Sequence, residues 1–161
     1  MSVLVSSLVW GLALSLLMSA LILGIMWVRP RLMLHHYPPS IQAKVPLATE
    51  EERRLSKISL GVSLPLVFGL PVLAAVLLGL EPIDAFFHGA GMMLVLGIVD
   101  LVIIDWLIFC WLRPSFMVLP GSEGAGGYGD YRHHAIGFAR GLPLAAATGL
   151  AAALAGVIAN G

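Results

Sequence analysis

The sequence predicts an all-α polytopic membrane protein, with four transmembrane helices in a bundle and a single membrane domain over residues 1–161. Hydrophobic residues make up 59% of the chain and charged residues 11%, and the mean hydropathy is +0.96. Soluble domains carry about 25% charged residues. Four apolar blocks each approach the ~20 residues that a helix needs to cross hydrocarbon, where a helix satisfies its own backbone hydrogen bonds. All nine Lys and Arg residues follow the first or the third block.

The first span covers about residues 3–28. Its positive charges follow the apolar segment, and the segment exceeds the roughly 7–15 residues of a signal-peptide core, so we expect an uncleaved span. Small residues recur at every fourth position and give one face that a neighbouring helix can approach closely. They are Ser7, Gly11, Ser15 and Ser19.

The second span covers about residues 58–80, and its helix is predicted to begin earlier, as a charged helix outside the membrane. Thr49 and Glu52 have the spacing of a capping box, in which each side chain bonds to the backbone N–H of the other residue. Pro65 and Pro71 each remove a helical hydrogen bond, which predicts a kink within this span.

The third and fourth spans cover about residues 86–112 and 142–159. The two segments between paired spans, about 29–57 and 113–141, hold all nine Lys and Arg residues. Basic residues close to span ends stay on the cytoplasmic side of the membrane. Both segments are therefore predicted to be cytoplasmic, and both termini to lie outside.

Two acidic residues inside the third span, Asp100 and Asp105, are the strongest functional candidates. An ionised Asp at the centre of a membrane helix costs about 2.5–3.5 kcal/mol on insertion scales, so such residues usually have a function. In an α-helix, residues five apart point about 140° apart, which predicts no close carboxylate dyad. One hypothesis is an acid that binds a proton or cation. The other is a carboxyl group bonded to hydroxyls such as those of Ser15, Ser63 or Thr148, or to backbone groups that Pro65 leaves free.

The histidines of the two cytoplasmic segments form a second candidate group. Imidazoles from both segments, together with Asp105, Asp130 or Glu123, are ligand types that bind Zn²⁺ or another divalent ion. The alternative is a set of interfacial histidines that contact phosphates or loop carbonyls. Adjacent histidines seldom point the same way, so at most one of each pair is expected to be a ligand. The four are His35, His36, His133 and His134.

Residues 127–134 combine aromatic, acidic and basic side chains. With charge from Arg132 and Arg140, this segment is predicted either to bind an anionic lipid head group or to act as an aromatic anchor at the interface. The nearby glycines lack the Lys-Ser/Thr ending of a phosphate-binding loop, and no cofactor can be named from the sequence. The complete candidate site is Asp100, Asp105, Asp130, Arg132, His35, His36, His133 and His134.

Several stretches resemble a family of short, uncharacterised bacterial membrane proteins. They are Asp-Leu-Val-Ile-Ile-Asp-Trp-Leu-Ile-Phe-Cys (100–110), Arg-Pro-Ser-Phe (113–116), Leu-Pro-Gly-Ser-Glu-Gly (119–124), Gly-Tyr-Gly-Asp-Tyr-Arg-His-His-Ala-Ile-Gly-Phe (127–138), His-His-Tyr-Pro-Pro-Ser-Ile-Gln (35–42) and Val-Pro-Leu-Ala-Thr-Glu-Glu-Glu (45–52). The likeness covers about the central two thirds of the chain. It implies a bacterial cytoplasmic membrane and no particular activity.

Three functions remain open on the sequence. The first is a non-enzymatic accessory or ligand-binding membrane component, because no nucleophile–base set is evident. The second is an intramembrane or lipid-modifying enzyme that uses Asp105 with His133 or His134. The third is a small proton- or cation-coupled transporter. Expected partners are membrane lipids and either another membrane protein or a second copy of the chain. No basic face of a soluble domain points to nucleic acid.

Overall fold

The four predicted membrane helices are the framework of the structure, a computed structural model that describes residues 2–160 apart from the side chain of Asn160. Four helices are long and apolar enough to cross a membrane, and the described residues contain no strand. The helices are Val3–Val28, Glu50–Leu77, Pro82–Leu112 and Tyr131–Ala159. The all-α class and the four-helix membrane bundle are thereby confirmed.

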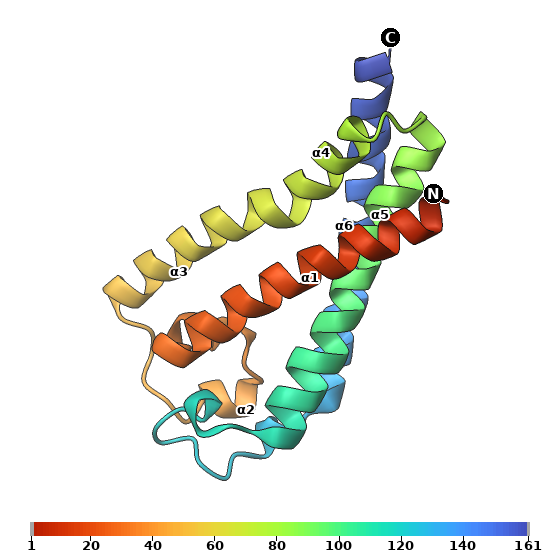
Figure 1. Cartoon of the computed structure of the whole chain (residues 1–161). Helices are drawn as coiled ribbons and strands as arrows, with labels where there is room; N and C mark the ends of the chain where they lie inside the picture. Colours follow the sequence, from red (N-terminus) through yellow and green to blue (C-terminus); the bar gives the residue numbers. More distant parts are fainter. Residues whose placement is uncertain (1, 161) are drawn as a thin grey trace.

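The third and fourth helices run side by side, and the first helix and the last part of the second pack against them (Figure 1). Helix α5 (Pro82–Val99) continues into a π-helix, η3 (Asp100–Leu112), and packs along α6 (Tyr131–Asn160). The helices approach so closely that a Cβ atom on Gly149 would lie 2.7 Å from the carbonyl oxygen of Phe86. Small residues are therefore required where α6 crosses α5.

Helix α1 (Val3–Val28) packs on α5 through the face of small residues that the sequence predicts. Ser7, Gly11 and Ser15 are buried, and a Cβ on Gly11 would lie 2.8 Å from the Cβ of Val95. The fourth member of that pattern, Ser19, is half-buried.

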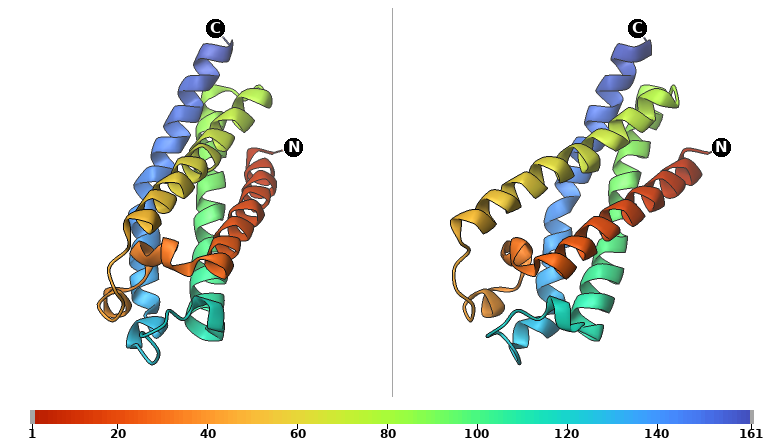
Figure 2. Two further views of the ribbon diagram at one scale, coloured as in Figure 1. Left: turned by 90° about the vertical axis from the view of Figure 1, so that its left-hand side faces the viewer. Right: turned by 60° about the vertical axis from the view of Figure 1, so that its left-hand side comes forward.

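The second membrane helix consists of α3 (Glu50–Leu64), a π-helical turn η2 (Pro65–Gly69) and α4 (Leu70–Leu77). The predicted capping box is present, since Glu52 N–H donates to Thr49 Oγ1 at 3.2 Å and Thr49 N–H donates to Glu52 Oε2 at 2.8 Å. Helix α4 packs against α5 and α6, whereas α3 has no buried residue. The right-hand view of Figure 2 shows α3 standing away from α5 and α6.

The predicted span limits differ from the helices at several ends. The fourth helix begins at Tyr131 instead of residue 142, because Asp130 Oδ1 accepts the His133 N–H at 2.9 Å, as the residue before a helix does. Part of the predicted segment 113–141 is therefore helical. The third helix begins at Pro82 instead of 86, with proline in its first turn. The helix of the second span ends at Leu77 instead of 80.

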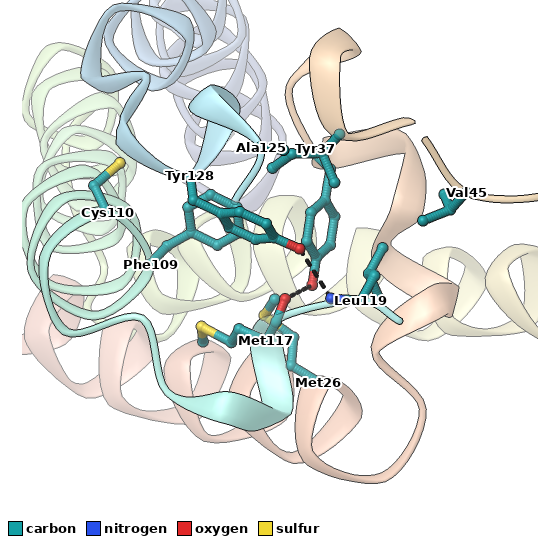
Figure 3. Packing of buried hydrophobic residues seen from close by; sticks show 10 residues of the cluster. Met26, Tyr37, Val45, Phe109, Cys110, Met117, Leu119, Ala125 and Tyr128 are labelled. Atoms are coloured by element: carbon teal, nitrogen blue, oxygen red, sulfur yellow. Dashed lines mark hydrogen bonds between the residues drawn. The ribbon is translucent and has the colours of Figure 1, made fainter. Parts of the chain in front are cut away.

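Residues 29–49 and 113–130 pack together into what we call the loop layer. Its short helices are η1 (Pro30–His36), α2 (Pro39–Gln42), η4 (Ser115–Met117) and η5 (Gly126–Gly129). Buried residues from both segments share one core with the end of η3 (Figure 3). The Tyr37 hydroxyl donates to the Met117 carbonyl at 2.9 Å, and the Tyr128 hydroxyl accepts from Leu119 N–H at 2.9 Å. The two termini lie at the opposite end of the bundle, as Figure 1 shows.

Candidate functional site

The π-helical geometry of η3 places the two aspartates differently from an α-helix. In a π-helix each N–H bonds to the carbonyl five residues earlier, so residues five apart lie on the same side of the helix. The bond that ends η3 has this register, from Arg113 N–H to the Ile108 carbonyl at 2.9 Å. The angle of about 140° assumed an α-helix and does not apply to this π-helical segment, whereas the expectation that the two carboxylates form no close dyad stays a prediction. The two carboxylates are close enough to repel each other electrostatically.

Asp105 forms the central contact of the site with His134 of α6. The Nδ1 atom of His134 lies 3.0 Å from Asp105 Oδ1, and the two side chains are 8% and 24% exposed. The His134 ring packs edge-on against Phe109, with ring centroids 5.0 Å apart. The other ring nitrogen, Nε2, is buried and has no hydrogen-bond partner among the described residues. The carboxylate thus fixes the ring through Nδ1 and leaves Nε2 uncommitted.

Asp100 lies one π-turn deeper in the bundle and interacts electrostatically with both members of that pair. The hydroxyls that the sequence offers as partners for the aspartates bond elsewhere. Those of Ser15, Ser63 and Thr148 donate to carbonyls of their own helices at 2.7, 2.8 and 2.9 Å. The hypothesis of hydroxyl-bonded carboxyl groups is therefore not supported for these three donors.

Two further histidines lie between the Asp105–His134 pair and the loop-layer surface. His133 Nε2 is 3.3 Å from the His36 carbonyl oxygen, and its ring centroid is 5.3 Å from that of His134. The ring of His36 is 4.0 Å from that of His35 and within electrostatic range of Asp105 and His133. Burial, followed by repulsion from His35, lowers the pKa of His36 to about 4.

The remaining candidates do not join this cluster. Asp130 caps α6 through the His133 N–H, and Arg132 is exposed and forms no ion pair with the residues that the structure describes. Within residues 2–160, no three His, Cys, Asp or Glu side chains come together closely enough to hold a metal ion. The hypothesis of a metal site made by at most one histidine of each pair with an acidic residue therefore has no counterpart among the described residues.

Residues 127–134 are divided between two structures. Tyr128 is buried in the loop layer, where its hydroxyl also lies 2.7 Å from Ser122 Oγ. Tyr131 begins α6 and is exposed, and its carbonyl accepts from Trp106 Nε1 at 3.3 Å. Aromatic side chains such as Trp106 and Tyr131 are common at the membrane–water interface. Tyr128, by contrast, is part of the buried core of the loop layer.

A buried histidine at the opposite end of the bundle is absent from the predicted site. His88 is fully buried, and its Nε2 is 3.1 Å from Ser6 Oγ of α1. Its Nδ1 has no hydrogen-bond partner in the described part of the chain. The sequence signal was a histidine inside an apolar helix, combined with the small residues of α1 that allow a close approach. Because His88 lies far from the other histidines in the sequence, the predicted site does not include it.

Comparison with known proteins adds no relative. No protein-family model, no curated protein and no solved structure matches the chain. The arrangement of the site therefore carries the functional argument alone.

Proposed function

We propose that the protein is a non-enzymatic membrane component that binds and releases a proton at the Asp105–His134 pair, and that it serves proton-coupled transport. The contact of 3.0 Å between His134 Nδ1 and Asp105 Oδ1 carries this proposal. Asp105 belongs to a helix apolar enough to cross a membrane, where acidic residues commonly form proton relays.

Proton binding at this pair would change a local charge. With a neutral imidazole and an ionised carboxylate the pair is negative, and it repels the neighbouring Asp100. One added proton makes the pair neutral overall, whichever partner holds it, and weakens that repulsion. Charge neutralisation beside a π-helical segment is a physical route from proton binding to a change of conformation.

Protons would reach the Asp105–His134 pair from the side of the loop layer. His133 and His36 lie between the pair and that surface. In the other direction, the twelve residues from His88 to Asp100 correspond to about 18 Å of helix, too far for direct proton transfer. Release at the far side would therefore require water or a second conformation.

The orientation that we propose puts the loop layer in the cytoplasm of a bacterial cell and both termini outside. The distribution of charge supports it, because all nine Lys and Arg residues lie in the loop layer or in the helical turns next to it. Four spans are few for a transporter, so a second copy or a partner membrane protein would complete the pathway. An accessory subunit of a larger complex is compatible with the same site.

The test is the charge movement that follows a pH step in proteoliposomes on a solid-supported membrane. We expect a transient current from the unaltered protein. Asp105→Asn and His134→Gln should each reduce it at least tenfold, whereas His35→Gln, a histidine outside the pair, should leave it unchanged. Thermal unfolding of each variant shows whether it is folded. Equal currents in all four proteins, or no current from the unaltered protein, would refute the proposal.

A second candidate is a lipid-modifying enzyme. The observation that favours it is the imidazole held by a carboxylate through Nδ1 with Nε2 uncommitted, which is how hydrolases orient a general base. The buried position of Nε2 requires a substrate to displace Phe109 or part of the loop layer. An enzyme would change the lipids of the proteoliposomes over time, as seen by mass spectrometry, and His134→Gln would stop the change.

A further inference from the structure

We propose that His88 is a second proton-binding site, and that a proton bound there separates the amino-terminal part of α1 from α5. His88 belongs to the first half of α5, at the same end of the bundle as the two termini (Figure 1). Its side chain is fully buried, with Nε2 3.1 Å from Ser6 Oγ of α1. Its Nδ1 is also buried and bonds to none of the described residues.

The unequal treatment of the two ring nitrogens indicates a role beyond packing. Buried polar atoms normally have hydrogen-bond partners, and an exception requires an explanation. The Ser6 hydroxyl satisfies Nε2, whereas the neighbouring Ser7 hydroxyl donates to the Val3 carbonyl of its own helix at 2.8 Å. An apolar side chain of the same shape would fill the position of His88 without the cost of an unsatisfied nitrogen.

The helices around His88 carry no charge that would balance a protonated ring. Helix α5 packs against α1, α4 and the second half of α6 at this end. Residues 3–28, 70–77 and 141–160 of these helices contain no titratable side chain. On the chain of α5 itself, the nearest acids are Asp84, one turn before His88, and Glu81, which precedes the helix. Neither forms an ion pair with His88 in the described part of the chain. A proton on His88 would therefore create an uncompensated buried charge.

The protonated ring needs acceptors that the closed packing does not provide. Both nitrogens of an imidazolium are donors, whereas a neutral imidazole has one donor. The proton on Nδ1 has no acceptor among the described residues. Asp84 is half-buried and lies four residues earlier, on the same face of the helix as His88. Entry of water between α1 and α5, with Asp84 at its edge, would stabilise the charge. Protonation therefore favours a state in which α1 has moved away.

The contact that must open is close. Ser6 and Ser7 are both buried, and a Cβ atom on Gly91 of α5 would lie 2.9 Å from the Cβ of Ser7. A separation by the width of one water molecule therefore breaks the contact completely. Tightly packed interfaces of this kind change between discrete arrangements and do not deform continuously. We therefore expect two states, a closed one with neutral His88 and an open one with the proton bound.

The test is the distance between α1 and α5 as a function of pH, measured by electron paramagnetic resonance. Spin labels are attached at Leu4→Cys and Ile83→Cys, where the native side chains are exposed, so the labels stay outside the helix interface. The native cysteine is removed by Cys110→Ala. The labelled full chain is studied in lipid nanodiscs between about pH 8 and about pH 4, a range that includes the usual titration of histidine.

We expect the distance to increase by about 3 Å as the pH falls, the width of a water molecule of ~30 Å³. His88→Gln should abolish this increase. His88→Leu, which fills the same position with an apolar side chain, should do so too and serves if His88→Gln fails to fold. His134→Gln is the matched control, because it removes a buried histidine at the other end of the bundle. It should retain the increase.

Two results would overturn the proposal. One is a distance that does not change with pH in the labelled protein with His88 intact. The other is an increase that persists in the His88 variants, and its loss in His134→Gln would then assign the movement to the Asp105–His134 pair. Because the distance is measured without any current, this outcome is separate from that of the charge-movement experiment on the pair.

Discussion

The two nitrogens of His134 have different surroundings, and this difference follows from where α6 begins. Because the helix starts at Tyr131, the neighbouring His133 and His134 point in directions about 100° apart. His134 faces Asp105 across the helix interface, and His133 faces the loop layer. The sequence predicts that Asp105 has a histidine partner, but it cannot choose between these two without the starting point of the helix.

The low pKa of His36 predicts a decline of stability in mild acid. In the unfolded chain the imidazole has its usual pKa near 6.5, while in the folded protein burial and His35 lower it to about 4. Between these pH values the unfolded state binds more protons, so stability is complete above about pH 6.5 and falls as the pH drops toward about 4. The ring is partly open to water, so we expect a loss of about 1 kcal/mol, well below the full linkage value.

Unfolding in detergent between neutral pH and about pH 4 measures this decline. His36→Gln should remove it and leave a flatter stability profile. His35→Gln is the control that keeps the His36 imidazole and should retain most of the slope. A slope that is the same in His36→Gln and the unaltered chain would assign the acid sensitivity to other groups.

At the scale of the elements, the helical spans were predictable and their internal geometry was not. Hydropathy identifies residues 3–28 closely, because the whole helix is apolar. It misses the first turns of α6, since Arg132, His133 and His134 are polar although the chain there is helical. The π-helix at Asp100–Leu112 gives no sequence signal comparable to a proline, and without it Asp100 and Asp105 would not lie near each other.

The crossing of α5 and α6 predicts a sharp difference between two glycines of the same helix. Gly149→Ala would place a Cβ 2.7 Å from the Phe86 carbonyl oxygen, so the helices must move apart. We expect a loss of about 1–3 kcal/mol in the free energy of unfolding, as for other overpacked sites. Gly137→Ala meets nothing within 4 Å and should be neutral or slightly stabilising. Reversible unfolding in mixed micelles measures the stability of both variants. Equal stability of Gly149→Ala and Gly137→Ala would mean that α5 and α6 are not in close contact at Gly149.

At the scale of the whole molecule, the loop layer is the part that sequence analysis could not assemble. Tyr37 donates to the carbonyl of Met117, 80 residues later, and each segment alone looks like an irregular loop. The pairing depends on α1 and η3 ending at the same level of the bundle. The sequence predicts the charge of these segments and their common side, but not their shared core.

The proposed orientation predicts opposite accessibility for the two ends of the bundle. Cys110 is the only cysteine and is fully buried, so background labelling by an impermeant maleimide should be low. In intact cells, Ser2→Cys should react, because the amino terminus is expected outside. Leu47→Cys, at an 89% exposed position of the loop layer, should react only after permeabilisation. The reverse labelling pattern would show that the protein has the opposite orientation in the membrane.

The contact between Tyr37 and Met117 also sets an order of events during synthesis. Tyr37 and Ile41 leave the ribosome long before Met117 and Leu119, with which they share a core. During that interval the first segment has emerged, but the surface that will bury its aromatic and aliphatic side chains does not yet exist. The loop layer can therefore fold only after the third span and residues 113–130 have been synthesised.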